Sequence, residues 1–150
     1  NDQRIDFERR SKHDYNGEYV LRLLQDNIRT YVSHSDLLHA ANEEVRLINT
    51  LFELVELGQV PDNANTKARI IQIHNSAMQH IDGMSILNTL DTRVELAYYA
   101  LLLGRRPVAV QLMQPIIALK IPLAPNQMRS LEVGEHLKFV CEELEITLRQ

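Results

Sequence analysis

One glutamate falls on the apolar face of a predicted helix, where a carboxylate could act as an acid or a base. Counting about 100° per residue, a helix over residues 35–57 places Glu44 among Leu37, Ala40, Ile48 and Leu51. Its neighbour Glu43 points to the polar half of the same helix. A carboxylate on a buried face is costly unless a partner compensates it. The sequence therefore predicts a partner for Glu44 on a neighbouring helix.

A histidine, His74, occupies a matching place in a helix predicted over residues 66–81. It lies within the apolar stripe of Ile70, Ala77, Met78 and Ile81. If the two helices pack face to face, Glu44 and His74 meet, either in a structural hydrogen bond or as an acid/base pair whose pKa values are set by burial. A salt bridge from Glu44 to Arg69 is a further structural interpretation. The structural interpretations are favoured, and the candidate catalytic residues are His74, Glu44 and Arg69.

Two segments share the spacing of an arginine, four residues and a histidine: Arg29 to His34, and Arg69 to His74. This spacing resembles the Arg-x4-6-His signature of the HEPN nucleases, which are small all-α domains. The resemblance covers two residues in each segment. The polar residue that follows the arginine in those enzymes is Thr30 in the first segment and is replaced by Ile70 in the second. The resemblance implies an alternative function, a small helical ribonuclease that uses His74 with Arg69 or Glu44.

Neither a metal site nor a cofactor site is predicted. Zinc ligands on one helical face are three or four residues apart, whereas His34 and His39 are five apart. The sequence has no Gly-x-Ser-x-Gly elbow and no glycine-rich phosphate loop. The single cysteine, Cys141, lies on an apolar stripe and is predicted to be a small buried hydrophobic residue.

The composition argues against several classes of partner. The net charge of −4 and the interleaved charges of residues 1–16 argue against nucleic-acid binding. The longest apolar run, residues 96–103, is far shorter than the span of about 20 residues that crosses a membrane. One cysteine excludes an internal disulfide and indicates the cytoplasm or another reducing compartment. A chain of 150 residues fits one domain, predicted here as residues 17–150 after a charged arm or frayed helix over 1–16.

The helix over residues 35–57 is the element around which the others are expected to pack. Its apolar seam has the helical period, with Leu38, Ala41, Val45, Ile48, Phe52 and Val55. Ser35 is the predicted N-terminal cap, Asp36 suits the helix dipole, and Gly58 ends the helix. A stripe of this width predicts packing against two or more neighbours.

The remaining segments also favour helices with short connections. The first helix begins near Gly17, and the tight link over residues 33–35 makes it antiparallel to the next. A capping box over Thr92–Glu95 opens a helix that ends near Leu103. Residues 108–119 favour a helix kinked at Pro115, although their alternation also suits a strand. With a last helix over residues 126–148, the fold class is an all-α bundle of about six helices.

Two segments present apolar side chains that suit a protein partner. The last predicted helix has a second stripe on an acidic face, Met128, Phe139 and Ile146, which indicates docking to another helix unless the helix is sandwiched within the monomer. The helix over residues 93–103 is apolar nearly all round, including Tyr98 and Tyr99. We therefore expect a helical protein–protein interaction module, regulatory or adaptor in kind, that forms a two-fold homodimer. The alternative is the small helical enzyme.

Overall fold

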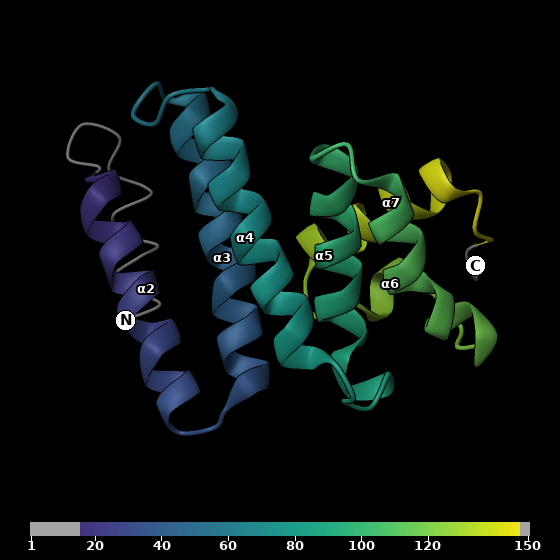
Figure 1. Ribbon diagram of the computed structural model, residues 1–150. Helices are drawn as coiled ribbons and strands as arrows, with labels where there is room; N and C mark the ends of the chain where they lie inside the picture. The colour runs from purple at the N-terminus through teal and green to yellow at the C-terminus, as the bar shows by residue number, and fades with distance from the viewer. Residues whose placement is uncertain (1–15, 148–150) are drawn as a thin grey trace. The chain divides into compact units, whose positions relative to one another are not determined.

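The computed structural model of the protein describes residues 16–147 (Figure 1). This part of the chain contains six α-helices and no strand. The predicted all-α class is confirmed. The helices are α2 (Gly17–Ser33), α3 (Leu37–Glu56), α4 (Ala64–Ile81), α5 (Leu90–Leu102), α6 (Arg106–Ala118) and α7 (Leu131–Leu144). Single turns of 3-10 helix, η1 (Leu87–Thr89) and η2 (Pro125–Gln127), come before α5 and α7. The predicted charged arm lies outside the described residues, apart from Asn16.

The chain packs as two compact units. Unit 1 ends at Ala77 and unit 2 begins at Met78, so the division falls within α4. The connections from α2 to α3 and from α5 to α6 are short, as the sequence predicts, whereas residues 119–130 separate α6 from α7. That residues 17–150 form one domain stays a prediction.

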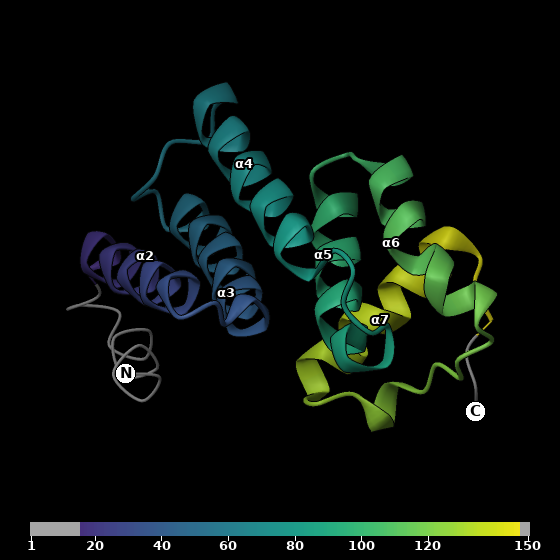
Figure 2. The same cartoon turned by 60° about the horizontal axis from the view of Figure 1, so that its bottom comes forward.

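In unit 1, α2 and α3 form the antiparallel pair that the short connection predicts (Figure 2). The side chain of Asn16 caps α2 by accepting a hydrogen bond from the amide of Tyr19 at 3.1 Å. In the turn, the amide of Asp36 donates to the carbonyl of Tyr31 at 2.8 Å, which fixes the angle between the helices. The buried face of α2 is formed by Gly17, Val20, Leu21 and Leu24.

The predicted cap of α3 is wrong by one residue. Asp36, and not Ser35, is the cap residue, and its carboxylate accepts a hydrogen bond from the amide of His39. Ser35 has a φ of 57°, a left-handed conformation that belongs to the turn and not to a helix start. At the other end, Gly58 has a φ of 75°, so its predicted role in ending the helix is confirmed.

The buried face of α3 is wider than the predicted seam. The middle of the seam is buried, at Ala41, Val45 and Ile48. Its ends are half-buried, at Leu38, Phe52 and Val55. Beside the seam, the enclosed apolar residues are Ala40, Leu47, Leu51 and Leu54. This breadth places Glu44, which lies among them, inside the protein.

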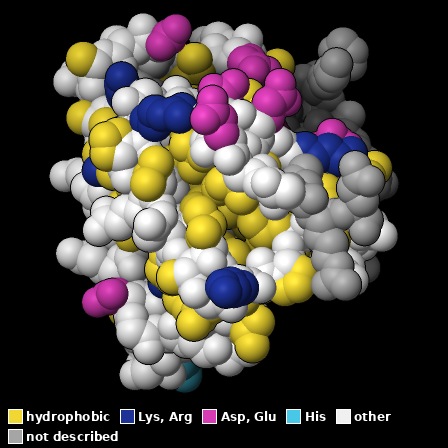
Figure 3. Space-filling view, turned by 90° about the vertical axis from the view of Figure 1, so that its right-hand side faces the viewer, with side chains coloured by type: hydrophobic (Ala, Val, Ile, Leu, Met, Phe, Trp, Pro, Cys, Tyr) yellow, Lys and Arg dark blue, Asp and Glu magenta, His cyan; other side chains and the backbone are white. Residues whose placement is uncertain are grey.

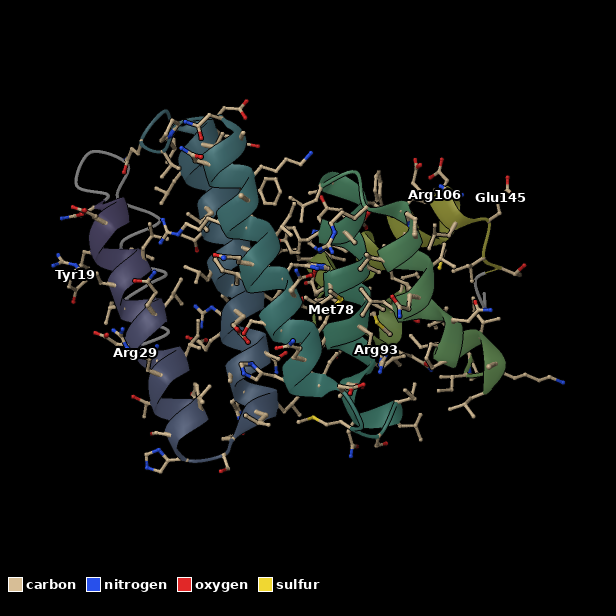
Figure 4. All side chains as sticks on the ribbon, in the orientation of Figure 1. Tyr19, Arg29, Met78, Arg93, Arg106 and Glu145 are labelled. Carbon is tan, nitrogen blue, oxygen red and sulfur yellow. The ribbon has the colours of Figure 1, made fainter. Side chains whose placement is uncertain are left out.

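In unit 2, α5 packs against both α6 and α7. The Arg93 side chain ties α5 to α6, because its Nη1 donates to the carbonyl of Leu112 at 3.2 Å (Figure 4). The segment of η2 lies against α7, where Gly134 permits a very close approach. A Cβ atom at Gly134 would lie 2.6 Å from the carbonyl oxygen of Pro125.

The predicted start of α5 is wrong. The helix begins at Leu90, directly after η1, so Thr92 and Glu95 lie within it and do not form a capping box. The cause is the preceding 3-10 turn, η1, which continues directly into α5, so that the helix begins two residues earlier than predicted. The Glu95 carboxylate is therefore too far along α5 to reach the free amides of the helix start and is available to another partner.

The helix predicted for residues 108–119 is confirmed as α6, with Pro115 inside it. The last helix is shorter than predicted, because α7 begins at Leu131 and not near Asn126. Ser130 caps it by accepting a hydrogen bond from the amide of Val133 at 3.2 Å. At its end, Glu145 has a φ of 58°, which turns the chain away.

Candidate functional site

Glu44 is buried, with 4% of its surface exposed, and it lines a cavity of about 440 Å³ in unit 1 that is widely open to solvent. All three helices of this unit contribute to the cavity, which also includes Arg29 of α2 and Arg69 of α4. Glu44 has an interaction partner in the structure. The sequence therefore located a buried acid correctly, and the structure places it at one cavity with Arg69.

Each helix lines this cavity with one face, which explains how the chain builds it. From α4 come Arg69, Gln72, Ile73 and Ser76, at the spacing of one helical face. From α2 come Gln25, Ile28 and Arg29, and from α3 come Glu44 and Leu47. The wall of the cavity therefore combines one carboxylate, two guanidinium groups, side-chain amides and three large aliphatic side chains.

His74 is fully buried, and the wall of this cavity does not include it. It also has an interaction partner in the structure. Acid/base catalysis requires a histidine that reaches a substrate atom, directly or through one water. Complete burial gives the enzymatic interpretation no geometric support, and a pairing of Glu44 with His74 stays a prediction.

Glu43 is also buried, with 8% of its surface exposed, so the prediction that it points to water is wrong. Its two carboxylate oxygens accept hydrogen bonds from Asn27 Nδ2 at 3.1 Å and from Arg46 Nη1 at 3.2 Å. The period of α3 assigns Glu43 to the polar half correctly. The helical period of α3 cannot show, however, that α2 covers part of this polar half.

Unit 2 contains a histidine cluster that sequence reasoning missed. His136 of α7 donates from Nδ1 to the Glu95 carboxylate of α5 at 2.5 Å, and both side chains are largely buried. The Tyr98 ring stacks on the His136 ring, with centroids 3.7 Å apart and an interplanar angle of 10°. Phe139 meets the edge of Tyr98 at 5.5 Å, and Tyr99 meets His136 at 6.1 Å.

The environment of this cluster favours uncharged Tyr98. Burial raises the pKa of the Tyr98 phenol, and the carboxylates of Glu95 and Glu132 raise it further. One sequence signal for the cluster was present, because His136 lies on the same stripe as Val133, Leu137 and Val140. The position of Glu95 as a lone acid in an apolar helix was another.

The predicted second stripe on the last helix is wrong, because two of its members lie outside α7. Met128 precedes the helix and Ile146 follows it, and both are half-buried. Phe139 remains on the helix surface, with 37% of its area exposed. Of the tyrosines proposed as binding residues, Tyr98 is half-buried and Tyr99 is buried.

A different apolar surface is present on α6. Val110 and Ile117, one heptad apart, are exposed by 42% and 45%, and Leu119 follows at 61%. No residue from 107 to 119 is ionisable, and the exposed polar residues between Val110 and Ile117 are Gln111 and Gln114. Figure 3 shows hydrophobic side chains gathered near the middle of one face of unit 2, with both acidic and basic side chains around them. We call Val110, Gln111, Gln114 and Ile117 the charge-free face of α6.

The described residues contain no group of three or more side chains that could hold a metal ion. His39 instead hydrogen-bonds to the Asp36 carboxylate through Nδ1, at 2.8 Å, and stacks on Tyr31. The hydrogen bond from His39 lowers the pKa of Asp36. Cys141 is buried as predicted, and burial raises the pKa of its thiol to about 11, which disfavours the thiolate.

Within residues 16–147, no helix combines the length and the apolar character that crossing a membrane requires. Protein-family models, curated proteins and solved structures give no match to the chain. A functional conclusion therefore depends on the chemistry of the surfaces and cavities described above.

Proposed function

We propose that the chain is a helical interaction module that associates with a second copy of itself through the charge-free face of α6. The observation that carries this proposal is the exposure of Val110 and Ile117 on a helix without an ionisable residue from 107 to 119. The buried centres of protein interfaces are depleted of charged residues, because burying an unpaired charge is costly.

The absence of charge on this face allows a second copy to be the partner. Each chain has a net charge of −4, so two copies repel each other on average. The charge-free face of α6 is a surface on which two copies can meet without placing like charges together. A two-fold axis brings the same patch of both copies together. Gln111 and Gln114 suit this arrangement, because an amide both donates and accepts and can pair with its own symmetry mate.

The test is the mass in solution of the wild type and of a double variant, Val110→Glu with Ile117→Glu. We expect the wild type to show about twice the chain mass of 17.3 kDa in sedimentation or light scattering over a concentration series, and the double variant to show the chain mass. Val32→Glu on α2 is the matched control, because Val32 is exposed by 41% and should leave the mass of the wild type unchanged.

Two results would contradict the proposal. One is a wild type of single-chain mass at every concentration. The other is a folded double variant that retains the mass of a dimer, which would place the interface elsewhere. Because both substituted residues are exposed, circular dichroism should show the same helix content in all the variants.

A further inference from the structure

The cavity of unit 1 has opposite charges on different helices. Glu44 of α3 is almost completely buried, whereas Arg29 of α2 and Arg69 of α4 are exposed, so the acid is recessed and the bases are at the rim. From this arrangement we infer that the cavity binds a small zwitterion with an aliphatic body, namely an aliphatic α-amino acid. The ammonium group lies towards Glu44 and the carboxylate towards the arginines.

The two charged ends of the ligand follow from the wall of the cavity. A guanidinium can bind a carboxylate with two parallel hydrogen bonds. Arg69 places a guanidinium at the rim of the cavity. A purely anionic ligand would be repelled by Glu44, and a purely cationic ligand would be repelled by both arginines. Arg29 already pairs with Asp26 and Glu44 has a partner of its own, so the ligand shares these groups and needs neither to be free.

The aliphatic body follows from the three large apolar side chains of the wall. Ile28, Leu47 and Ile73 come from three different helices and therefore line the cavity on more than one side. Removing apolar ligand surface from water is the main favourable term for such a wall. The cavity is open to solvent, and its volume of about 440 Å³ falls within the range of about 300 to 1,000 Å³ that ligand sites span.

The test uses three probes that share one carbon skeleton: L-leucine, 3-methylbutan-1-amine and 4-methylpentanoic acid. The amine lacks the carboxylate, and the acid lacks the ammonium group. In titration calorimetry with the full chain, we expect L-leucine to bind at least about tenfold more tightly than either probe. Failure of L-leucine to bind at millimolar concentration, or equal binding of all three probes, would overturn the inference.

Variants assign the two ends of the ligand. Glu44→Gln should weaken L-leucine and the amine by about tenfold and should not weaken the acid, which the Glu44 carboxylate repels. Arg69→Gln should weaken L-leucine and the acid and should not weaken the amine. Arg22→Gln is the control, because Arg22 is an exposed α2 residue that does not line this cavity. If the losses for Glu44→Gln and Arg69→Gln do not separate in this way, the proposed orientation is wrong.

A measurement on the wild type covers the case in which Glu44→Gln fails to fold. Methyl resonances of Ile28 and Ile73, which line the cavity, should shift when L-leucine is added. The methyl groups of Val133 and Val140 in unit 2 are the reference and should stay unchanged. Shifts at the reference groups without shifts at Ile28 and Ile73 would also overturn the inference.

Discussion

Both units bury a glutamate, but they give it different partners. In unit 1, Glu43 accepts hydrogen bonds from an amide, Asn27, and from a guanidinium, Arg46. In unit 2, Glu95 accepts a hydrogen bond from the imidazole of His136. The comparison shows that one physical requirement, a donor for each buried carboxylate, is met in unit 1 by an amide and a guanidinium and in unit 2 by an imidazole.

The exposed helix faces of the two units also differ. On α2 the exposed residues include the charged side chains of Glu18, Arg22, Asp26 and Arg29. On α6 the charge-free face offers only aliphatic and amide groups to solvent. The exposed side chains of α2 are therefore largely charged, whereas the charge-free face of α6 is the surface that we propose for association.

The largest expected difference between the units concerns the buried acids. Glu95→Ala leaves His136 without its hydrogen-bond partner in a largely buried site and should lower the free energy of unfolding by about 3 kcal/mol. Glu43→Ala should cost about 1 kcal/mol, because the Arg46 side chain is 26% exposed and can bond to water. Urea denaturation of both variants measures the two losses, and equal losses would remove the distinction between the two partners.

A smaller difference is expected when a methyl group is added at two buried glycines. At Gly134 the new Cβ would lie 2.6 Å from the backbone of Pro125, which cannot move without displacing η2. Gly134→Ala should therefore lower the free energy of unfolding by about 2 kcal/mol. At Gly17 the nearest atom is Cδ2 of Leu54, a buried side-chain atom and not backbone, and the loss should be smaller, about 1 kcal/mol.

Amide hydrogen exchange distinguishes the two glycine variants by location. Gly134→Ala should lower protection in α7, and Gly17→Ala should lower it in α2. A Gly134 variant as stable as the wild type would mean that η2 yields easily.

The smallest effect concerns the interior thiol of unit 2. The pKa of Cys141 rises from 9.0 to about 11 on folding, so the folded state binds this proton more tightly than the unfolded state. The stabilisation is complete below pH 9 and is lost as the pH rises towards 11, by about 1.4 kcal/mol at pH 10. Relative to Cys141→Ala, the wild type should lose this amount between pH 8 and pH 10 in urea denaturation. Parallel curves for the two proteins would show that the thiol ionises alike in both states.

Local signals in the sequence were sufficient to predict most of the helices. Apolar periodicity located α2, α3 and α4, and Gly58 marked a helix end that the structure confirms. The start of α7 was missed because residues 126–130 contain no strong helix breaker after Pro125. In the structure the helix starts after Ser130, whose side chain caps it, and residues 125–127 form the separate turn η2.

The candidate sites were harder to predict, because each depends on which helices meet. Periodicity identified Glu44 as a buried acid, but the cavity also requires α2 and α4. The partner of Glu95 is 41 residues away along the chain, and no local rule pairs them. The prediction for Glu43 was wrong for the same reason, because a helical period describes one helix and not its neighbours.

The turns after α3 and α5 have a consequence for chemical synthesis. Gly58 and Gly104 have φ angles of 75° and 74°, and a Cβ added at either position would meet no atom within 4 Å. This is the left-handed backbone region that L-amino acids avoid and that D-amino acids prefer. A D-alanine would fit at both positions and would restrict the unfolded chain. Two places in this all-L chain are thus already shaped for the opposite chirality.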